Sequence, residues 1–124
     1  MSVYIVLTRN DPATLYVAAA LTASYAVLGN DTTLFITGNA ILAFRKKPIV
    51  TNLSEHELYV KANAVYLNII SDSKALGNVK VIACTGVMGV YGVDRDDLHE
   101  IVDDVLDFPT LISRIKDSDK VLVI

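Results

Sequence analysis

The stretch that decides the fold runs from Lys80 to Val93 and reads KVIACTGVMGVYGV. It begins as a short, β-branched apolar run, which is typical of a strand buried on both faces of a parallel sheet. The run ends in Cys84, the only cysteine of the chain, and continues into a segment with glycines at 86, 89 and 92. The stretch therefore predicts a buried strand that delivers one thiol to a turn. That thiol is either a small core residue, with the glycines allowing close packing, or a reactive group.

The length and composition predict a single domain over residues 1–124. Hydrophobic residues make up 52% of the chain and the mean hydropathy is +0.44, which is high for 13.5 kDa. A chain this small has much surface for its volume, so we expect part of the apolar surface to lie in an interface between copies. The uncharged segment between Asp11 and Asp31 is rich in Ala, Thr and Ser, which favours a buried helix over a membrane span.

Charge and cysteine content narrow the choice of partners and compartment. The net charge is −3 and the pI is about 5.2, so no basic field exists to attract nucleic acid or an anionic membrane. We expect neither as a partner. One cysteine cannot form an internal disulfide, and residues 1–8 lack the features of a signal peptide. Both observations favour a cytoplasmic location.

Alternating apolar runs and helical patterns predict an α/β fold of three layers. Strands are expected at residues 3–8, 32–37, 79–84 and 120–124, with a very short one at 105–107. Helices are expected at residues 12–28, 40–44, 54–76, 94–104 and 109–116, the one at 54 opening with a Ser54–Glu57 capping box. With right-handed crossovers, the economical arrangement is a mostly parallel sheet of four or five strands in a flavodoxin-like order, 2-1-3-4.

In such sheets ligands collect at the carboxyl ends of the strands, where the strand order reverses. The order 2-1-3-4 places the loop after the first strand, with Arg9 and Asn10, beside the loop that follows Cys84. A thiol at the start of a helix has its anionic form stabilised by free backbone N–H groups. Arg9 would add positive charge if it points inward. The sequence therefore predicts a thiol site at this edge of the sheet.

Other site chemistries fit the sequence less well. No phosphate-binding glycine motif follows the first strand, and a receiver domain would need an aspartate where Cys84 stands. The acidic residues between 94 and 104 do not have the spacing of a calcium loop. His56 and His99 with one cysteine make a poor metal set, so we expect no metal and no cofactor. A cysteine–histidine hydrolase that uses His99 as the base stays open as a minor alternative. Such a base is recognised by its distance from the thiol in the folded protein, which the sequence does not give.

The Cys84 stretch, followed by an acidic segment, resembles the DsrE/DsrF-like sulfur-relay family. In that family a strand ends in a cysteine, a short helix with a methionine follows, and a glycine with an aliphatic residue closes it. Residues 34–38 (LFITG) resemble the family's second-strand motif, and residues 119–124 (DKVLVI) resemble its terminal strand. The chain departs from the family at residues 107–109 (DFP), where relatives tend to show a glycine-rich turn.

The resemblance implies a cytoplasmic subunit that assembles into a homotrimer or homohexamer. Its Cys84 would accept sulfane sulfur as a persulfide or thiosulfonate from a donor protein and pass it to an acceptor. The residues expected to bind the sulfur anion are Arg9, Asn10, Thr85, Gly86 and Val87. The alternative is a non-catalytic oligomeric module that binds a small ligand and keeps Cys84 as a core residue.

Overall fold

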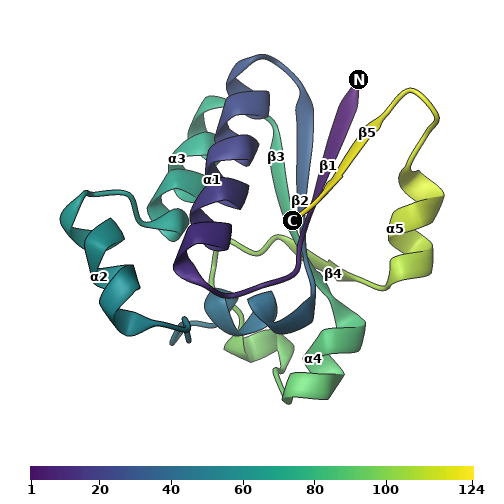
Figure 1. The fold of residues 1–124 in the computed structure, drawn as a ribbon. Helices are drawn as coiled ribbons and strands as arrows, with labels where there is room; N and C mark the ends of the chain where they lie inside the picture. Colours follow the sequence, from purple (N-terminus) through teal and green to yellow (C-terminus); the bar gives the residue numbers. More distant parts are fainter.

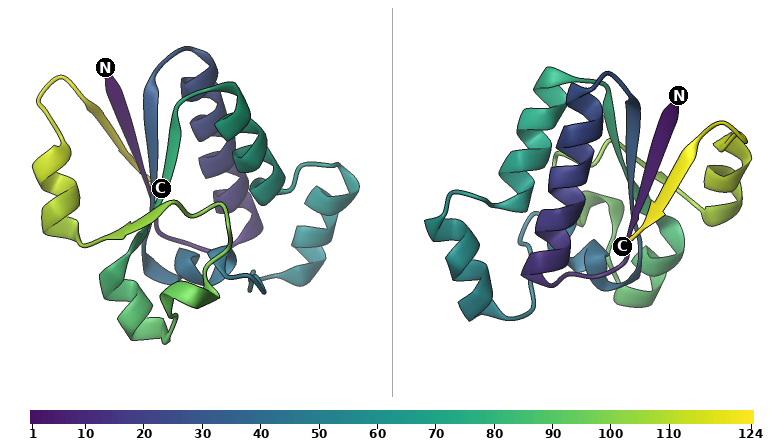
Figure 2. Two further views of the ribbon diagram at one scale, coloured as in Figure 1. Left: turned by 180° about the vertical axis from the view of Figure 1, so that it is seen from behind. Right: turned by 45° about the horizontal axis from the view of Figure 1, so that its top comes forward.

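The computed structural model describes all residues from Met1 to Ile124 and contains one five-stranded sheet between helices (Figure 1). The strands are β1 (Ser2–Leu7), β2 (Asp31–Ile36), β3 (Val79–Cys84), β4 (Asp104–Leu106) and β5 (Lys120–Val123). The helices are α1 (Pro12–Val27), α2 (Leu53–Lys61), α3 (Tyr66–Leu76), α4 (Thr85–Tyr91) and α5 (Phe108–Arg114), with 3₁₀ turns η1 (Gly38–Phe44) and η2 (Arg95–Asp97). Helices α1 and α3 cover one face of the sheet and α5 covers the other (Figure 2). The predicted three-layer α/β class is confirmed.

All strands are parallel, in the order β4-β3-β2-β1-β5. The predicted order 2-1-3-4 is wrong, because β2 lies between β1 and β3. Strands β2, β3 and β4 are each added beside the preceding strand in the same direction across the sheet. Only β5 lies on the other side of β1. Right-handed crossovers that step one way place their helices on one face, and the returning crossover places α5 on the opposite face.

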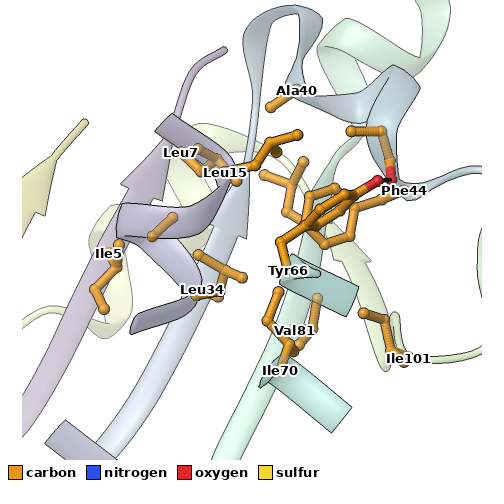
Figure 3. Packing of buried hydrophobic residues seen from close by; sticks show 14 of the residues in the cluster. Ile5, Leu7, Leu15, Leu34, Ala40, Phe44, Tyr66, Ile70, Val81 and Ile101 are labelled. Atoms are coloured by element: carbon orange, nitrogen blue, oxygen red, sulfur yellow. Dashed lines mark hydrogen bonds between the residues drawn. The ribbon is translucent and has the colours of Figure 1, made fainter. Parts of the chain in front are cut away.

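The main core lies between the sheet and the two helices α1 and α3. It contains 21 buried residues, whereas the cluster under α5 contains 6. Leu15 of α1, Leu34 of β2 and Ile70 of α3 all point into the main core (Figure 3). The α5 side of the sheet is therefore the thinly covered one. None of the helices combines the length and hydropathy that crossing a membrane would require.

The predicted helix over residues 54–76 is two helices, α2 and α3. Asn63 adopts φ +56 between them, a left-handed conformation that asparagine tolerates and that ends a helix. The N-cap of α2 is Asn52, whose side chain accepts a hydrogen bond from the backbone N–H of Glu55 at 3.1 Å. The predicted Ser54–Glu57 capping box is therefore wrong by two residues, and the Ser54 hydroxyl donates to Asn52 instead.

The predicted helix over residues 94–104 is also wrong. Only the 3₁₀ turn η2 forms, and the chain then passes through a turn at Glu100 and Ile101 before it enters β4. The cause is non-local: the Asp103 carboxylate accepts the Val81 N–H at 2.8 Å and pairs with Lys74 Nζ at 2.6 Å. The backbone N–H of Asp103 also donates to the Val81 carbonyl at 2.7 Å. These bonds align residues 103–106 beside β3. The short strand expected at 105–107 is confirmed one residue earlier, as β4.

The Tyr66 hydroxyl joins α3 to η1 inside the core. It donates a hydrogen bond to the carbonyl of Ala43, and burial raises the pKa of Tyr66. We predict that Tyr66→Phe lowers the free energy of unfolding by about 1–2 kcal/mol, because the buried Ala43 carbonyl loses this donor. Urea denaturation measures the change, with Tyr59→Phe as the control, since the Tyr59 hydroxyl has no protein partner. Equal unfolding midpoints for the Tyr66 variant and the wild type would contradict the prediction.

Candidate functional site

Cys84 is the last residue of β3 and the N-cap residue of α4. Its backbone is extended, with φ −76 and ψ 119, so the chain leaves the strand and enters the helix without an intervening loop. The position at the carboxyl end of a buried strand is the one predicted, and it is confirmed. Only 2% of Cys84 is exposed, and its Sγ makes no hydrogen bond.

The thiol lies on the α5 face of the sheet. Val6, Phe35 and Ile82 are partners across β1, β2 and β3, and so point to one face. Cys84 follows Ile82 by two residues in the strand and therefore shares that face. The buried residues clustered with it are Tyr4, Val6, Phe35, Ile82 and Leu111, and the half-buried residues that pack on this cluster are Val87, Leu106 and Ile115. The surroundings of Sγ are apolar.

The first turn of α4 passes close to the thiol. A Cβ placed on Gly86 would lie 3.7 Å from Sγ, an ordinary van der Waals distance, so space alone does not require glycine there. Thr85 and Gly86 are exposed and Val87 is half-buried. No side chain caps α4. Backbone N–H groups of a first turn lack partners within the helix, so the anion-binding role of residues 85–87 stays a prediction that this geometry permits.

Arg9 and Asn10 occupy a different part of the same edge. With β2 between them, β1 and β3 lie roughly 10 Å apart, so the predicted side-by-side placement of their loops is wrong. Asn10 is 2% exposed; its backbone N–H donates to Asn39 and its side-chain amide to the Ile49 carbonyl at 3.1 Å. Arg9 is exposed and makes no hydrogen bond or ion pair. The sulfur-anion role of both residues stays a prediction.

The segment that lies between these loops is η1, which sequence reasoning did not connect with the site. It follows β2 and packs against α4 at the carboxyl edge of the sheet, the lower end in Figure 1. Gly38 opens η1 with φ +56, directly against the backbone carbonyl of Thr8. The signal was the Gly38-Asn39 pair after a strand, which marks a turn but not its neighbours.

The carboxylates on this side of the sheet whose pKa values are shifted, Asp107 and Asp119, lie before and after α5. Hydrogen bonds from the side chain and then the backbone of Thr110 lower the pKa of Asp107, the N-cap residue of α5. The backbone N–H of Lys116, at 2.9 Å, lowers the pKa of Asp119. Burial raises the pKa of Tyr4, whose hydroxyl donates to the carbonyl of Arg114 at 3.3 Å. These hydrogen bonds lie at the two ends of α5 and in the turn that follows it.

No hydrolytic or metal-binding arrangement accompanies Cys84. The Nδ1 of His99 accepts the backbone N–H of Ile101 at 3.1 Å, in the turn after η2, and makes no hydrogen bond with Cys84. No group of three or more His, Cys, Asp or Glu side chains could hold a metal ion. The widest surface hollow, about 510 Å³, lies between α1 and α2 beside Tyr16 and Tyr59, away from the thiol.

The fold and the position of Cys84 define a class: a parallel α/β protein with a lone thiol where a strand meets a helix. The model of the DsrE/DsrF-like family matches residues 1–124, and the chain belongs to this family. The chain is similar in fold to the ychN protein from E. coli, with a TM-score of 0.65, 19% identity and complete coverage of both chains. It is also similar to MTH1491 from Methanobacterium thermoautotrophicum, described as a protein of unknown function, with a TM-score of 0.63 and 13% identity over 99% of this chain and 98% of that one. No curated protein matches the sequence.

Proposed function

We propose that the chain is a sulfur carrier in which Cys84 accepts sulfane sulfur and passes it to a partner protein. The observation that carries the proposal is the placement of the only thiol at the end of β3 and the uncapped start of α4, in a chain of the DsrE/DsrF-like family. The proposal includes a cytoplasmic location, where a reducing environment keeps a single thiol free.

The transfer is a pair of thiol exchange steps and needs no external oxidant. The Cys84 thiolate, its proton released to solvent, attacks the sulfane sulfur of a persulfide or polysulfide. A bond forms from Sγ to that sulfur while the donor's own sulfur–sulfur bond breaks, and the donor thiolate leaves with the electron pair. An acceptor thiolate then attacks the outer sulfur, and Cys84 departs as a thiolate. Because the chain has one cysteine, discharge must go to another molecule.

The burial of Cys84 favours a second candidate, a non-catalytic oligomeric module in which this residue only fills the core. Mass spectrometry separates the two after the folded protein is incubated with polysulfide or tetrathionate. The carrier gains a single adduct on Cys84 that dithiothreitol removes. A protein that stays unmodified under conditions where a small thiol is modified would favour the core residue.

Arg9 offers a test of charge at this edge of the sheet. We predict that Arg9→Ala lowers the rate of Cys84 alkylation near neutral pH only modestly, because a cation favours the thiolate over the thiol but β2 separates the Arg9 loop from the end of β3. The measurement is the iodoacetamide rate of the wild type and the variant against pH. Lys46→Ala removes the same charge from another exposed site and serves as the control. Superimposable profiles for Arg9→Ala and the wild type would show that Arg9 does not act on the thiol.

We further propose that the chain assembles into a homotrimer or homohexamer through the outer side of α1. This helix contains no charged residue, yet Tyr16, Val17 and Val27 are 36%, 43% and 66% exposed. A helix that is apolar all round is normally covered on all sides. We predict that light scattering detects an oligomer for the wild type and a smaller species for Val17→Glu. A wild type that stays at 13.5 kDa at micromolar concentration would contradict this.

A further inference from the structure

We infer that α5 is a lid over Cys84: its local detachment from the sheet exposes the thiol, and its return buries the thiol again. The use of this motion for sulfur loading rests on the proposed function, but the motion itself does not. The motion depends only on the weak attachment of α5 to the sheet and on the burial of Cys84 beneath it.

Helix α5 buries one side chain in the cluster that contains Cys84. Leu111 is its only buried residue, 2% exposed, and it belongs to the same apolar cluster as Cys84. Phe108 at the start of the helix is 42% exposed, and Ile112 is 61% exposed. In both views of Figure 2, α5 stands apart on the side of the sheet opposite α1 and α3. Loss of Leu111 would therefore remove the buried contribution of α5 to the cluster that contains the thiol, on which Val87, Leu106 and Ile115 also pack.

The remaining contacts of α5 are few and lie at its ends. The Phe108 ring meets Phe35 edge-on, with centroids 5.1 Å apart. The Tyr4 hydroxyl donates to the Arg114 carbonyl at 3.3 Å, and Asp107 caps the helix through the Thr110 N–H at 2.8 Å. A helix of seven residues is not stable by itself in water. Segments with little buried apolar surface open locally, well before the whole domain unfolds. We therefore expect α5 to detach as a unit.

The closed position of α5 favours the free thiol of Cys84 over the sulfur-loaded form. A neutral thiol packs in apolar surroundings as a small hydrophobe. A persulfide or thiosulfonate is anionic near neutral pH, whereas the side chains clustered with Cys84 are apolar apart from the Tyr4 hydroxyl, which donates to the Arg114 carbonyl. Burying an unpaired anion is strongly unfavourable. The loaded cysteine therefore favours the open position of α5, and closure returns after discharge.

The test is the iodoacetamide rate of Cys84 in the folded protein, followed by mass spectrometry. We expect Leu111→Ala to raise the rate about 30-fold, as the loss of the buried leucine favours opening. Ile112→Ala shortens an exposed side chain on the same helix and should leave the rate unchanged. Leu111→Met keeps the volume and should stay close to the wild type.

A second variant separates local opening from global unfolding. Ile70 is fully buried in the main core, on the far face of the sheet. Ile70→Ala destabilises the domain without touching α5, so a lid predicts an unchanged alkylation rate, and Ile70→Val serves if that variant does not fold. The free energy of unfolding of each variant is measured with urea.

The inference is overturned if Leu111→Ala reacts no faster than the wild type. It is also overturned if the Ile70 variant accelerates as much as Leu111→Ala for the same loss of unfolding free energy, since Cys84 would then react only in the unfolded chain. In the supporting outcome, the rate also depends only weakly on low urea concentrations, because a local opening exposes little surface. A protein that shows this pattern but takes up no sulfur would refute the proposed function and leave the lid in place.

Discussion

Replacing Cys84 by serine is expected to abolish sulfur uptake completely while leaving the fold and the assembly intact. Serine has nearly the same shape, but its hydroxyl is not ionised near neutral pH and does not attack sulfane sulfur. No other thiol exists in the chain to take over the reaction. Mass spectrometry of the variant after polysulfide treatment should therefore show only the unmodified protein.

The stability of this variant needs its own control. Burying the serine hydroxyl in an apolar cluster costs up to about 1–3 kcal/mol of unfolding free energy, and a hydrogen bond from a first-turn N–H of α4 to this N-cap hydroxyl would offset part of the cost. Cys84→Ala avoids the buried hydroxyl and should lose sulfur uptake equally. Urea denaturation and light scattering verify that both variants fold and assemble. A Cys84→Ser protein that still carries reducible sulfur would refute the role of this residue.

Gly38→Ala is expected to produce the largest loss of stability of any glycine-to-alanine change in the chain. Gly38 has φ +56, and a Cβ there would lie 2.3 Å from the backbone oxygen of Thr8. The left-handed conformation and the clash with a backbone atom together should lower the free energy of unfolding by about 2–5 kcal/mol. Because η1 packs against α4, relief of the clash should also disturb the start of α4, where Cys84 lies.

Gly92→Ala is the matched control for the Gly38 variant. Gly92 also has a positive φ, +64, but a Cβ there would meet nothing within 4 Å. It should lose only the conformational part, about 1 kcal/mol. Urea unfolding of both variants measures the difference. Equal losses at the two positions would show that the close approach of Gly38 to Thr8 does not constrain the fold.

The strands were predictable because each is a short apolar run bounded by turn residues, and β1, β2, β3 and β5 appear where the sequence placed them. Their order was not. All the long strands are apolar on both faces, so no local pattern says which neighbour each one takes. The returning crossover through α5 places β5, rather than β3, beside β1.

The helix errors have the same kind of cause. Leu58 and Ile69 share a helical periodicity that runs on through residues 62–65, but a single left-handed residue, Asn63, divides the segment. The acidic segment after Asp94 has helical spacing, yet Asp103 is held beside Val81 and Lys74 by bonds between distant parts of the chain. Hydrophobic periodicity shows which face of a helix is buried, but it does not show where the helix ends.

For the candidate site, the sequence identified the thiol and its place at a strand end but not its surroundings. Which face Cys84 occupies depends on sheet register, and which helix covers that face depends on the handedness of a crossover. The neighbours Phe35 and Leu111 come from parts of the chain far from Cys84 in sequence. Neither carries a motif that could have marked it. The burial of the thiol is for this reason a finding of the structure.

Transfer of a single sulfur atom tests the role of Cys84 most directly. The wild type is incubated with a persulfide donor, and the donor is then removed. Intact-protein mass spectrometry measures the mass of the protein before and after an acceptor thiol is added. We predict a gain of one sulfur atom, located on Cys84 by peptide mapping, and its loss as the same sulfur appears on the acceptor. A Cys84 that gains no sulfur, or gains an adduct that no thiol removes, would contradict the carrier role.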